Sequence, residues 1–406
     1  MLQATAQAAP VRAEAPALVI LPPGAAAGDG EISPATPLLG MPLLRRTVLA
    51  AERAGFGRIV VVCRDPAAVQ PLVEGTPAVA ARVGGPLPVL PPGRIVLLAP
   101  DVLAQPPWLR TLADMPMEAG ALCQDGEGVG VLEASEWLDL AAPLSPPQQD
   151  GGGGSGGGPD ASGMVRLRGP QDIPSAEAWL LRGLIKESEG FMSRRVERPI
   201  SLAITRRLVG TRISPNTMTA VSVILGFLAA PFFLSSAAAL QLAGALLFWL
   251  HSVLDGCDGE LARLRFQESR WGGLFDFWGD NIVHLAVFLC MGAGWALAVQ
   301  AAWPLLVGAA AAAGTLGSAV FVTRHVMRGT PAGGPLFTSV APARASRLSR
   351  LLDAVGQRDF IYTVIVFSAL GKAAWFLALA ALGAPMFFLL MLWSAWADSR
   401  RVEGCP

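Results

Sequence analysis

The chain has 406 residues, enough for two or three domains, and its apolar fraction of 52% with a mean hydropathy of +0.48 exceeds that of soluble globular proteins. At least part of the chain is therefore expected to lie in lipid. The formal net charge is zero, so no overall field favours nucleic acid as a partner. The five cysteines are scattered without CxxC or Cys/His spacing, which argues against a disulfide framework and a zinc finger.

The N-terminal third alternates short apolar runs with helical patterns. The runs ALVI, RIVVVC, RIVLL and GVGVLEA predict strands, while PLLRRTVLAAERAGFG and the region around Trp108 predict helices. This alternation is typical of an α/β sheet domain that binds ligands beyond the carboxyl ends of its strands. The sequence therefore predicts a small α/β domain over residues 1–145. The N-terminus has no basic region followed by a long apolar core, so no signal peptide is predicted.

A Gly/Ala/Pro-rich loop, PPGAAAGDG, follows the first predicted strand and precedes Thr36-Pro37-Leu38 and GMPLL. This order resembles the sugar-nucleotide type of nucleotidyltransferase, in which a Gly-rich loop with an arginine precedes Lys-Pro-Leu. Because the arginine and the lysine are missing here, we expect a degenerate, non-catalytic or regulatory domain rather than an active cytidylyltransferase. Asp101 matches that family's metal-binding aspartate, although a lone Asp after a strand more often serves a cap or a turn.

The next segment, SPPQQDGGGGSGGGPDASG, is too rich in Gly and Pro to form a core, and it predicts a linker over residues 146–175. A membrane domain is predicted over residues 176–406. It begins with a segment, MSRRVERPISLAITRRLVGTR, that interleaves arginines with apolar residues. This pattern suits an amphipathic helix on an anionic leaflet, and a positive-inside flank is the simpler alternative.

Six apolar segments follow, each near the ~20 residues that a spanning helix needs. Their approximate limits are Thr217–Leu234, Ala237–Leu254, Leu274–Val299, Ala301–Val322, Phe360–Leu377 and Ala378–Ala397. Arginines concentrate in the second-to-third and fourth-to-fifth connections and after the last segment. By the positive-inside rule, an integral membrane protein with both termini in the cytoplasm is predicted.

Four carboxylates lie between the second and third apolar segments, in DGCDGELARLRFQESRWGGLFDFWGD. Asp255 and Asp258 are one helical turn apart, and Asp276 and Asp280 repeat this at a spacing of four. Ionisable residues at membrane depth are costly, so this cluster predicts a functional site. Carboxylates that converge repel one another unless a divalent cation binds them, and two facing pairs suit a two-metal site for displacement at phosphorus.

The spacing of this stretch, D-x2-D-G-x2-A-R-x8-G-x3-D-x3-D, resembles the signature of the CDP-alcohol phosphotransferases. The matching positions are Asp255, Asp258, Gly259, Ala262, Arg263, Gly272, Asp276 and Asp280. The resemblance extends over about residues 194–401 and includes Thr219 before the first apolar segment. It implies six membrane helices, usually in a homodimer. It also implies transfer of a substituted phosphoryl group from a CDP-linked donor to an alcohol, with release of CMP.

The resemblance also implies roles for these residues. Asp255, Asp258 and Asp276 are implied to bind Mg²⁺ or Mn²⁺, and Asp280 is implied to act as the general base and to complete the two-metal site. The positions implied to bind the nucleotide are Thr219, Gly259, Ala262, Arg263 and Gly272. On residue grounds alone, Arg263 lies one turn after Gly259 and suits a phosphate, while pairing with a nearby carboxylate is the alternative.

Within the family, LDGCDGELAR and KESEGFMSRRVERPIS resemble the di-myo-inositol-phosphate-phosphate synthase branch, in which a cytidylyltransferase domain precedes the membrane domain. The resemblance implies CDP-diacylglycerol or CDP-inositol as donor, an alcohol such as an inositol phosphate as acceptor, and membrane lipid as a partner. Arg358 and Arg324 are candidates for the acceptor phosphate, with ordinary positive-inside roles as the alternative. A non-enzymatic ion-binding or transport protein is the competing class, in which acids would line a path across several spans.

Overall fold

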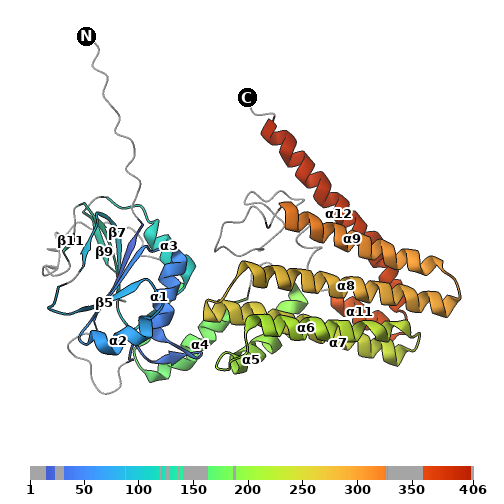
Figure 1. The fold of residues 1–406 in the computed structure, drawn as a ribbon, viewed down its shortest axis with the longest axis horizontal. Coiled ribbons are helices and arrows are strands. Elements are labelled where there is room, and N and C mark those ends of the chain that lie inside the picture. Colours follow the sequence, from blue (N-terminus) through green and yellow to red (C-terminus); the bar gives the residue numbers. More distant parts are fainter. Residues whose placement is uncertain are drawn as a thin grey trace, which may run out of the picture. The chain divides into compact units, whose positions relative to one another are not determined.

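The computed structural model describes residues 15–22, 32–86, 88–118, 120–124, 128–135, 138–139, 163–185, 189–325, 327 and 360–403. The chain divides into two compact units, Met1–Leu180 and Leu181–Pro406 (Figure 1), which are described separately. Only Pro22 of the loop PPGAAAGDG is described. Most of the predicted linker, including its Gly-rich run, also lies outside the described residues.

The first unit is built on a six-stranded sheet in the order β5-β4-β1-β7-β10-β9. Its strands are β1 Ala17–Ile20, β4 Arg58–Cys63, β5 Ala78–Arg82, β7 Gly93–Leu98, β9 Leu122–Gln124 and β10 Val129–Ala134. The first four pair in parallel, while β10 pairs antiparallel with β7 and with β9. All four residues of β1 are buried at the centre of the sheet, as expected for a short apolar run in a parallel sheet. The predicted α/β region is confirmed.

Helices and short strand pairs complete this unit. The helices are α1 Leu43–Ala54, α2 Pro66–Val73, α3 Pro106–Ala113 and α4 Ile173–Arg182. The short pairs are β2 Pro37–Leu38 with β3 Met41–Pro42, β6 Val89–Leu90 with β11 Leu138–Asp139, and β8 Val102–Ala104 with β12 Met164–Arg166. The chain crosses from β5 at one side of β1 to β7 at the other, so the sheet has a switch point between β1 and β7.

A buried arginine ties the β2–β3 hairpin to α1. Nη2 of Arg46 donates to the carbonyl oxygen of Leu38 at 3.0 Å, and the side chain is 2% exposed. Burial lowers the pKa of Arg46 to about 10, against the opposing effect of the Glu177 carboxylate. Glu177 in turn accepts from the backbone N–H of Leu39 at 3.1 Å. The hairpin that carries Thr36-Pro37-Leu38 is thus held between α1 and α4.

The second unit is helical. Its elements are a π-helical turn Ser193–Glu197, α5 Arg198–Leu208, α6 Pro215–Ala229 with a 3₁₀ turn Ala230–Leu234, α7 Ala238–Arg265, α8 Arg270–Val299, α9 Trp303–His325, α11 Phe360–Ala369 and α12 Ala373–Glu403. Within the described residues, five segments are long and apolar enough to cross a membrane, and α11 is a shorter apolar helix of 10 residues. The prediction of a helical membrane domain after an α/β region is confirmed.

The predicted boundaries between the fifth and sixth segments and between the second and third segments differ from the structure. The turn between the last two helices lies at Leu370–Lys372 rather than at Leu377, because Gly371 adopts a φ of 68° that ends α11. The second and third apolar helices also run on through the acidic stretch, so that α7 ends at Arg265 and α8 begins at Arg270. The four acids are therefore helical residues.

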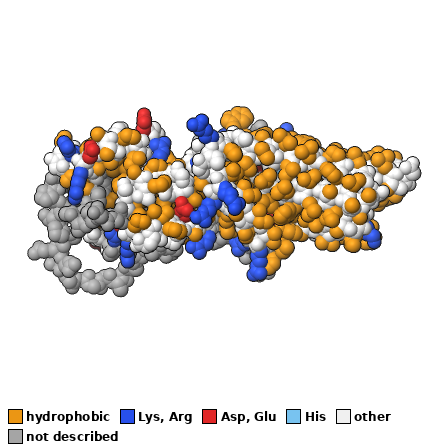
Figure 2. All heavy atoms as spheres, turned by 90° about the horizontal axis from the view of Figure 1, so that it is seen from below, with side chains coloured by type: hydrophobic (Ala, Val, Ile, Leu, Met, Phe, Trp, Pro, Cys, Tyr) orange, Lys and Arg blue, Asp and Glu red, His pale blue; other side chains and the backbone are white. Residues whose placement is uncertain are grey.

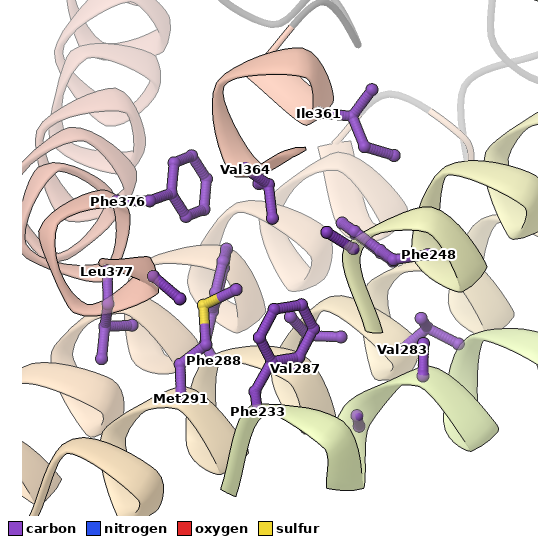
Figure 3. Packing of buried hydrophobic residues seen from close by; sticks show 14 of the residues in the cluster. Phe233, Phe248, Val283, Val287, Phe288, Met291, Ile361, Val364, Phe376 and Leu377 are labelled. Carbon is purple, nitrogen blue, oxygen red and sulfur yellow. The ribbon is translucent and has the colours of Figure 1, made fainter. Parts of the chain in front are cut away.

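Apolar side chains form both the interior and the outer surface of the helical unit. Figure 3 shows Phe233, Phe248, Phe288 and Phe376 converging from different helices in the buried core. Hydrophobic side chains also cover most of this unit's face in Figure 2, as expected for a surface in contact with lipid. Small residues bring helices close. A Cβ added to Gly314 of α9 would lie 2.4 Å from the backbone nitrogen of Pro385 in α12.

We predict that Gly314→Ala separates α9 from α12 and lowers stability by about 1–3 kcal/mol, because the added methyl group meets backbone atoms that cannot rotate away. Thermal unfolding of the purified protein in detergent measures the effect. Gly383→Ala is the matched control, since a Cβ at this α12 glycine meets no atom within 4 Å. Equal thermal unfolding midpoints for Gly314→Ala and Gly383→Ala would contradict the close packing of α9 against α12.

Candidate metal centre

The loop between α7 and α8 brings the two halves of the acidic stretch together. Phe266 ends α7 in the left-handed conformation with a φ of 55°. Ser269 then caps α8, its Oγ accepting from the backbone N–H of Gly272 at 3.0 Å. Because this loop is short, α8 runs in the direction opposite to α7 (Figure 1), and the acids near the end of α7 meet Asp276 near the start of α8.

Three of the four predicted ligands meet at one point. Asp255, Asp258 and Asp276 each present a carboxylate oxygen, and these atoms all lie within 4.8 Å of one another. Asp255 and Asp258 are each 4% exposed, and Oδ1 of Asp276 is buried with no hydrogen-bond partner among the described residues. Oxygens bound to one divalent cation at about 2.0–2.6 Å fall within this mutual distance. The residues therefore fit a divalent metal site.

Helix α6 supports this group. Oγ1 of Thr219, which is 2% exposed, donates to Oδ2 of Asp258, while the backbone N–H of Gly259 donates to Oδ1 of the same carboxylate. Ser214 caps α6 by accepting from the N–H of Thr217 at 3.1 Å, which fixes the first turn that carries Thr219. Both oxygens of Asp258 are thus oriented by neighbouring donors.

The predicted nucleotide-binding positions lie around the carboxylates. A Cβ added to Gly259 would lie 3.4 Å from Nη1 of Arg263, so the guanidinium group folds back one turn beside this glycine. Nε of Arg263 has no hydrogen-bond partner among the described residues. A Cβ at Gly272 would lie 3.0 Å from Oδ1 of Asn216, so that the start of α8 meets the start of α6 closely. Ala262 is half-buried on the same turn of α7 as Arg263.

Asp280 lies one turn beyond Asp276 on α8 and is not part of the group of three. Its Oδ1 is 3.4 Å from Nε2 of His251, a buried residue of α7. His284, which the sequence analysis did not select, packs its ring against Phe248 with the centroids 5.3 Å apart. The structure therefore gives Asp280 a different neighbour from the other three acids.

A fully buried glutamate joins α5 to the metal-facing part of α7. Glu260 accepts from Nη1 of Arg198 at 2.9 Å, from Oγ of Ser201 at 2.6 Å and from Oγ1 of Thr205 at 2.7 Å. Arg198 also pairs with Glu189 at 2.7 Å. Since Glu260 lies two residues after Asp258, these bonds hold α5 beside the turn that carries the metal ligands.

A second contact fastens the end of α5 to the end of α7. The guanidinium group of Arg265 donates to the carbonyl oxygens of Leu208 at 2.7 Å, Val209 at 2.9 Å, Thr211 at 2.8 Å and Ile213 at 2.6 Å. These are carbonyl groups of the connection between α5 and α6. The connection that leads into α6, and hence to Thr219, is therefore held by the same helix that carries Asp255 and Asp258.

The candidate acceptor residues are only partly described. Arg324 is exposed on the last turn of α9. Its neighbour Phe321 packs in a small cluster with Leu274 and Phe277, which flank Asp276 along α8, so Arg324 lies toward the acidic end of the unit. Arg358 lies outside the described residues.

Sequence reasoning missed His251 and Glu260. His251 precedes Asp255 by four residues and Asp258 by seven, so all three share one face of α7, and this spacing was a usable signal. Arg198, Ser201 and Thr205 form a polar stripe on α5 at helical spacing. The sequence of α5, however, does not show whether this stripe faces Glu260 or water, because its direction depends on how α5 packs against α7.

The helices and buried carboxylates described above define an integral membrane protein with a divalent metal site. Residues 212–399, just under half of the chain, match the family model described as CDP-alcohol phosphatidyltransferase. The matched residues contain α6 to α9, α11 and most of α12. The predicted resemblance to this family is confirmed.

Three curated relatives carry the description "Bifunctional IPC transferase and DIPP synthase". The protein from Rubrobacter xylanophilus is 40% identical over 144 residues, covering 34% of this chain and 32% of the relative. The one from Thermococcus kodakarensis is 39% identical over 125 residues, covering 30% and 28%. The one from Aquifex aeolicus is 27% identical over 235 residues, covering 57% and 50%. The aligned part of this chain thus spans half or less of each relative's length, and the predicted branch is confirmed.

Solved structures of a phosphatidylinositol phosphate synthase from Mycobacterium tuberculosis are also similar to this chain. The form with CDP-DAG bound has a TM-score of 0.36 and 20% sequence identity, and the match covers 49% of this chain and 94% of that protein. The form with manganese and citrate has a TM-score of 0.32 and 22% identity, covering 48% and 88%.

We predict that Glu260→Gln destabilises the helical unit by about 3 kcal/mol, because it removes the charge that Arg198, Ser201 and Thr205 surround in a buried place. Thermal unfolding in detergent is the measurement. Glu268→Gln is the control, since Glu268 is exposed in the loop between α7 and α8. If the Glu260→Gln protein and the unchanged protein unfolded at the same temperature, the Glu260 network would contribute little to stability.

Proposed function

We propose that this protein is a membrane CDP-alcohol phosphotransferase that moves a substituted phosphoryl group from a CDP-linked donor to an alcohol and releases CMP. The observation that carries the proposal is the convergence of Asp255, Asp258 and Asp276 within a domain that matches the family. Three carboxylates, each with an oxygen within 4.8 Å of the other two, suit a divalent cation, and such a cation can bind a diphosphate.

In this proposal Asp255, Asp258 and Asp276 bind Mg²⁺ or Mn²⁺, and Asp280 contributes to a second metal. A bound divalent cation neutralises charge on the diphosphate and on the leaving phosphate. Thr219 and the N–H of Gly259 keep the Asp258 carboxylate oriented toward the ligand position. Oxygen donors alone make up this ligand group, which favours hard cations over zinc.

Asp280 is proposed as the general base. The acceptor hydroxyl oxygen attacks the phosphorus of the transferred group, the bond from that phosphorus to the bridging oxygen of CMP breaks, and the hydroxyl proton passes to Asp280. Arg263, with an Nε that has no partner among the described residues, is placed to contact a donor phosphate held beside Gly259. Ala262 and Gly272 are proposed to leave room for the nucleotide.

The substrates are proposed from the relatives. Their descriptions name an IPC transferase and a DIPP synthase. We propose CDP-inositol or CDP-diacylglycerol as donor and an alcohol such as an inositol phosphate as acceptor. Arg324, exposed toward the acidic end of the helical unit, and Arg358 are proposed to bind the acceptor phosphate.

The membrane arrangement is a further part of the proposal. Six crossings, as the family resemblance implies, require that α11, an apolar helix of 10 residues, also crosses the membrane. The exposed Arg206, Arg207 and Arg212 lie on α5 and its connection to α6, which Arg265 fastens to the acidic end of α7. This supports a cytoplasmic active site and cytoplasmic termini by the positive-inside rule. A homodimer in membrane lipid is proposed from the family resemblance.

The first unit is proposed to be a degenerate nucleotidyltransferase-like domain that extends beyond the predicted residues 1–145, because β12 of the predicted linker (residues 146–175) pairs with β8 and α4 contacts the β2–β3 hairpin. A membrane domain, predicted over residues 176–406, follows it. Asp101, the candidate metal ligand of this domain, accepts from Nε of Arg166 at 2.8 Å. Its backbone carbonyl also accepts from Leu167. These bonds support a structural role for Asp101 and hence a non-catalytic or regulatory domain.

Release of CMP tests the proposed function directly. The purified full chain is incubated with CDP-diacylglycerol or CDP-inositol, each with inositol phosphate or glycerol phosphate, in Mg²⁺ or Mn²⁺. We expect CMP from at least one pair and its loss on chelation by EDTA, because the carboxylates then lack their cation. No CMP from any pair would overturn the proposal and favour the competing ion-binding or transport class.

Two aspartate variants separate the metal site from the proposed base. Asp280→Asn is expected to lower kcat by about 10²–10⁴-fold, the usual contribution of a general base, while Mn²⁺ binding to the group of three carboxylates and CDP-donor binding persist. Asp258→Asn is expected to weaken Mn²⁺ binding, because it removes a carboxylate of the group of three. Steady-state CMP release and Mn²⁺ titration by electron paramagnetic resonance provide the two readouts. Full turnover by Asp280→Asn would refute the base assignment.

A further inference from the structure

His251 is a buried polar residue of the membrane domain for which the reaction described above has no role. It lies on α7, is 2% exposed, and is four residues before Asp255. A polar side chain buried within a membrane helix is costly unless its ring nitrogens find partners. The question is therefore what each nitrogen contacts.

The two ring nitrogens of His251 face two different helices. Nδ1 lies 2.8 Å from the backbone carbonyl oxygen of Ser222 on α6. Because a carbonyl oxygen only accepts hydrogen bonds, Nδ1 is assigned the ring hydrogen, which fixes the ring's orientation. Nε2 then points to α8, where it lies 3.4 Å from Oδ1 of Asp280. The two groups form an ion pair when the imidazole is protonated, which leaves Asp280 as the carboxylate that a general base requires.

The surroundings of His251 hold the ring in this place. The Phe248 ring, one turn earlier on α7, stacks on it with an interplanar angle of 19° and centroids 5.9 Å apart. Gly226 of α6 leaves the room that the ring occupies, because an added Cβ would lie 3.1 Å from Cγ of His251 and 2.5 Å from Cγ1 of Val283. The imidazole is thus restrained by packing on one side and by the Ser222 carbonyl on another.

We propose that His251 is a positioning residue for Asp280, linking the carboxylate of α8 through the imidazole ring to the backbone of α6. This inference rests on the proposed function, in which Asp280 is the general base. Asp280 lies one turn away from the group of three carboxylates, so its orientation toward the acceptor depends on other contacts. His251 supplies one of them, and the hydrogen bond from its Nδ1 to the Ser222 carbonyl keeps the ring from turning.

Substitutions at His251 that keep one or the other nitrogen position test this role. His251→Gln places an amide near the Nε2 position, where it reaches Asp280, whereas His251→Asn places one near the Nδ1 position, where it reaches only the Ser222 carbonyl. His251→Leu removes both contacts. We expect His251→Leu and His251→Asn to lower kcat by about 10–100-fold, the usual effect of losing an orienting contact, with the KM for the CDP donor and Mn²⁺ binding to the group of three carboxylates unchanged. His251→Gln is expected to recover most of the rate.

A double-mutant cycle with Asp280→Asn distinguishes positioning from a general effect on folding. If His251 acts through Asp280, His251→Leu has no further effect on the residual rate of the Asp280→Asn protein. The inference would be overturned if His251→Leu lowered kcat equally in the unchanged protein and in the Asp280→Asn protein, or if His251→Gln and His251→Asn had equal rates. A loss of kcat that parallels a loss of thermal stability would overturn it as well. If the unchanged protein releases CMP and His251→Leu does not change kcat, this inference is refuted and the proposed function is not. Absence of CMP release from the unchanged protein refutes the proposed function and this inference with it.

Discussion

Three carboxylates held within 4.8 Å of one another, near the ends of two apolar helices, set the central constraint on this protein. Two unit charges 4 Å apart repel by about 4 kcal/mol at the effective dielectric constant of a protein near its surface. The fold therefore has to hold Asp255, Asp258 and Asp276 together against their repulsion. A divalent cation is therefore expected to bind favourably, since its binding removes the repulsion that the packing of α7 and α8 against α6 imposes on the three carboxylates.

The polar contacts that impose this packing lie at one end of the helical unit. Glu260 and Arg265 of α7 hold α5 and its connection to α6, and α6 in turn presents Thr219 to Asp258. Away from the acids, the helices meet through apolar side chains and glycines, with Phe233 and Phe288 in one core. Directional hydrogen bonds thus lie at the acidic end of the helical unit, where the carboxylates must be held in a defined arrangement. Less directional apolar contacts lie in the rest of the unit, where they hold the helices together.

The two units differ in what their polar residues do. In the sheet unit, Asp101 and Arg46 are engaged with Arg166 and with the backbone of Leu38, so their charges serve the fold. In the helical unit, the carboxylates of Asp255, Asp258 and Asp276 instead converge on one point. Both units hold buried polar atoms with no hydrogen-bond partner among the described residues, such as Oδ1 of Asp101 and Oδ1 of Asp276. The convergence of carboxylates therefore distinguishes the helical unit, which is also the part that matches the family.

The sequence by itself determined the helical membrane domain, the α/β region before it and the group of acids, because these follow from hydropathy, strand and helix periodicity, and the spacing of Asp255, Asp258 and Asp276. It did not determine where α11 ends, since the positive φ of Gly371 depends on the packing of both adjoining helices. Only the tertiary structure placed His251 against Asp280 and showed Glu260 facing α5 rather than water. Contacts between helices depend on how far each one rotates about its axis, and that rotation is set by packing between segments distant in sequence.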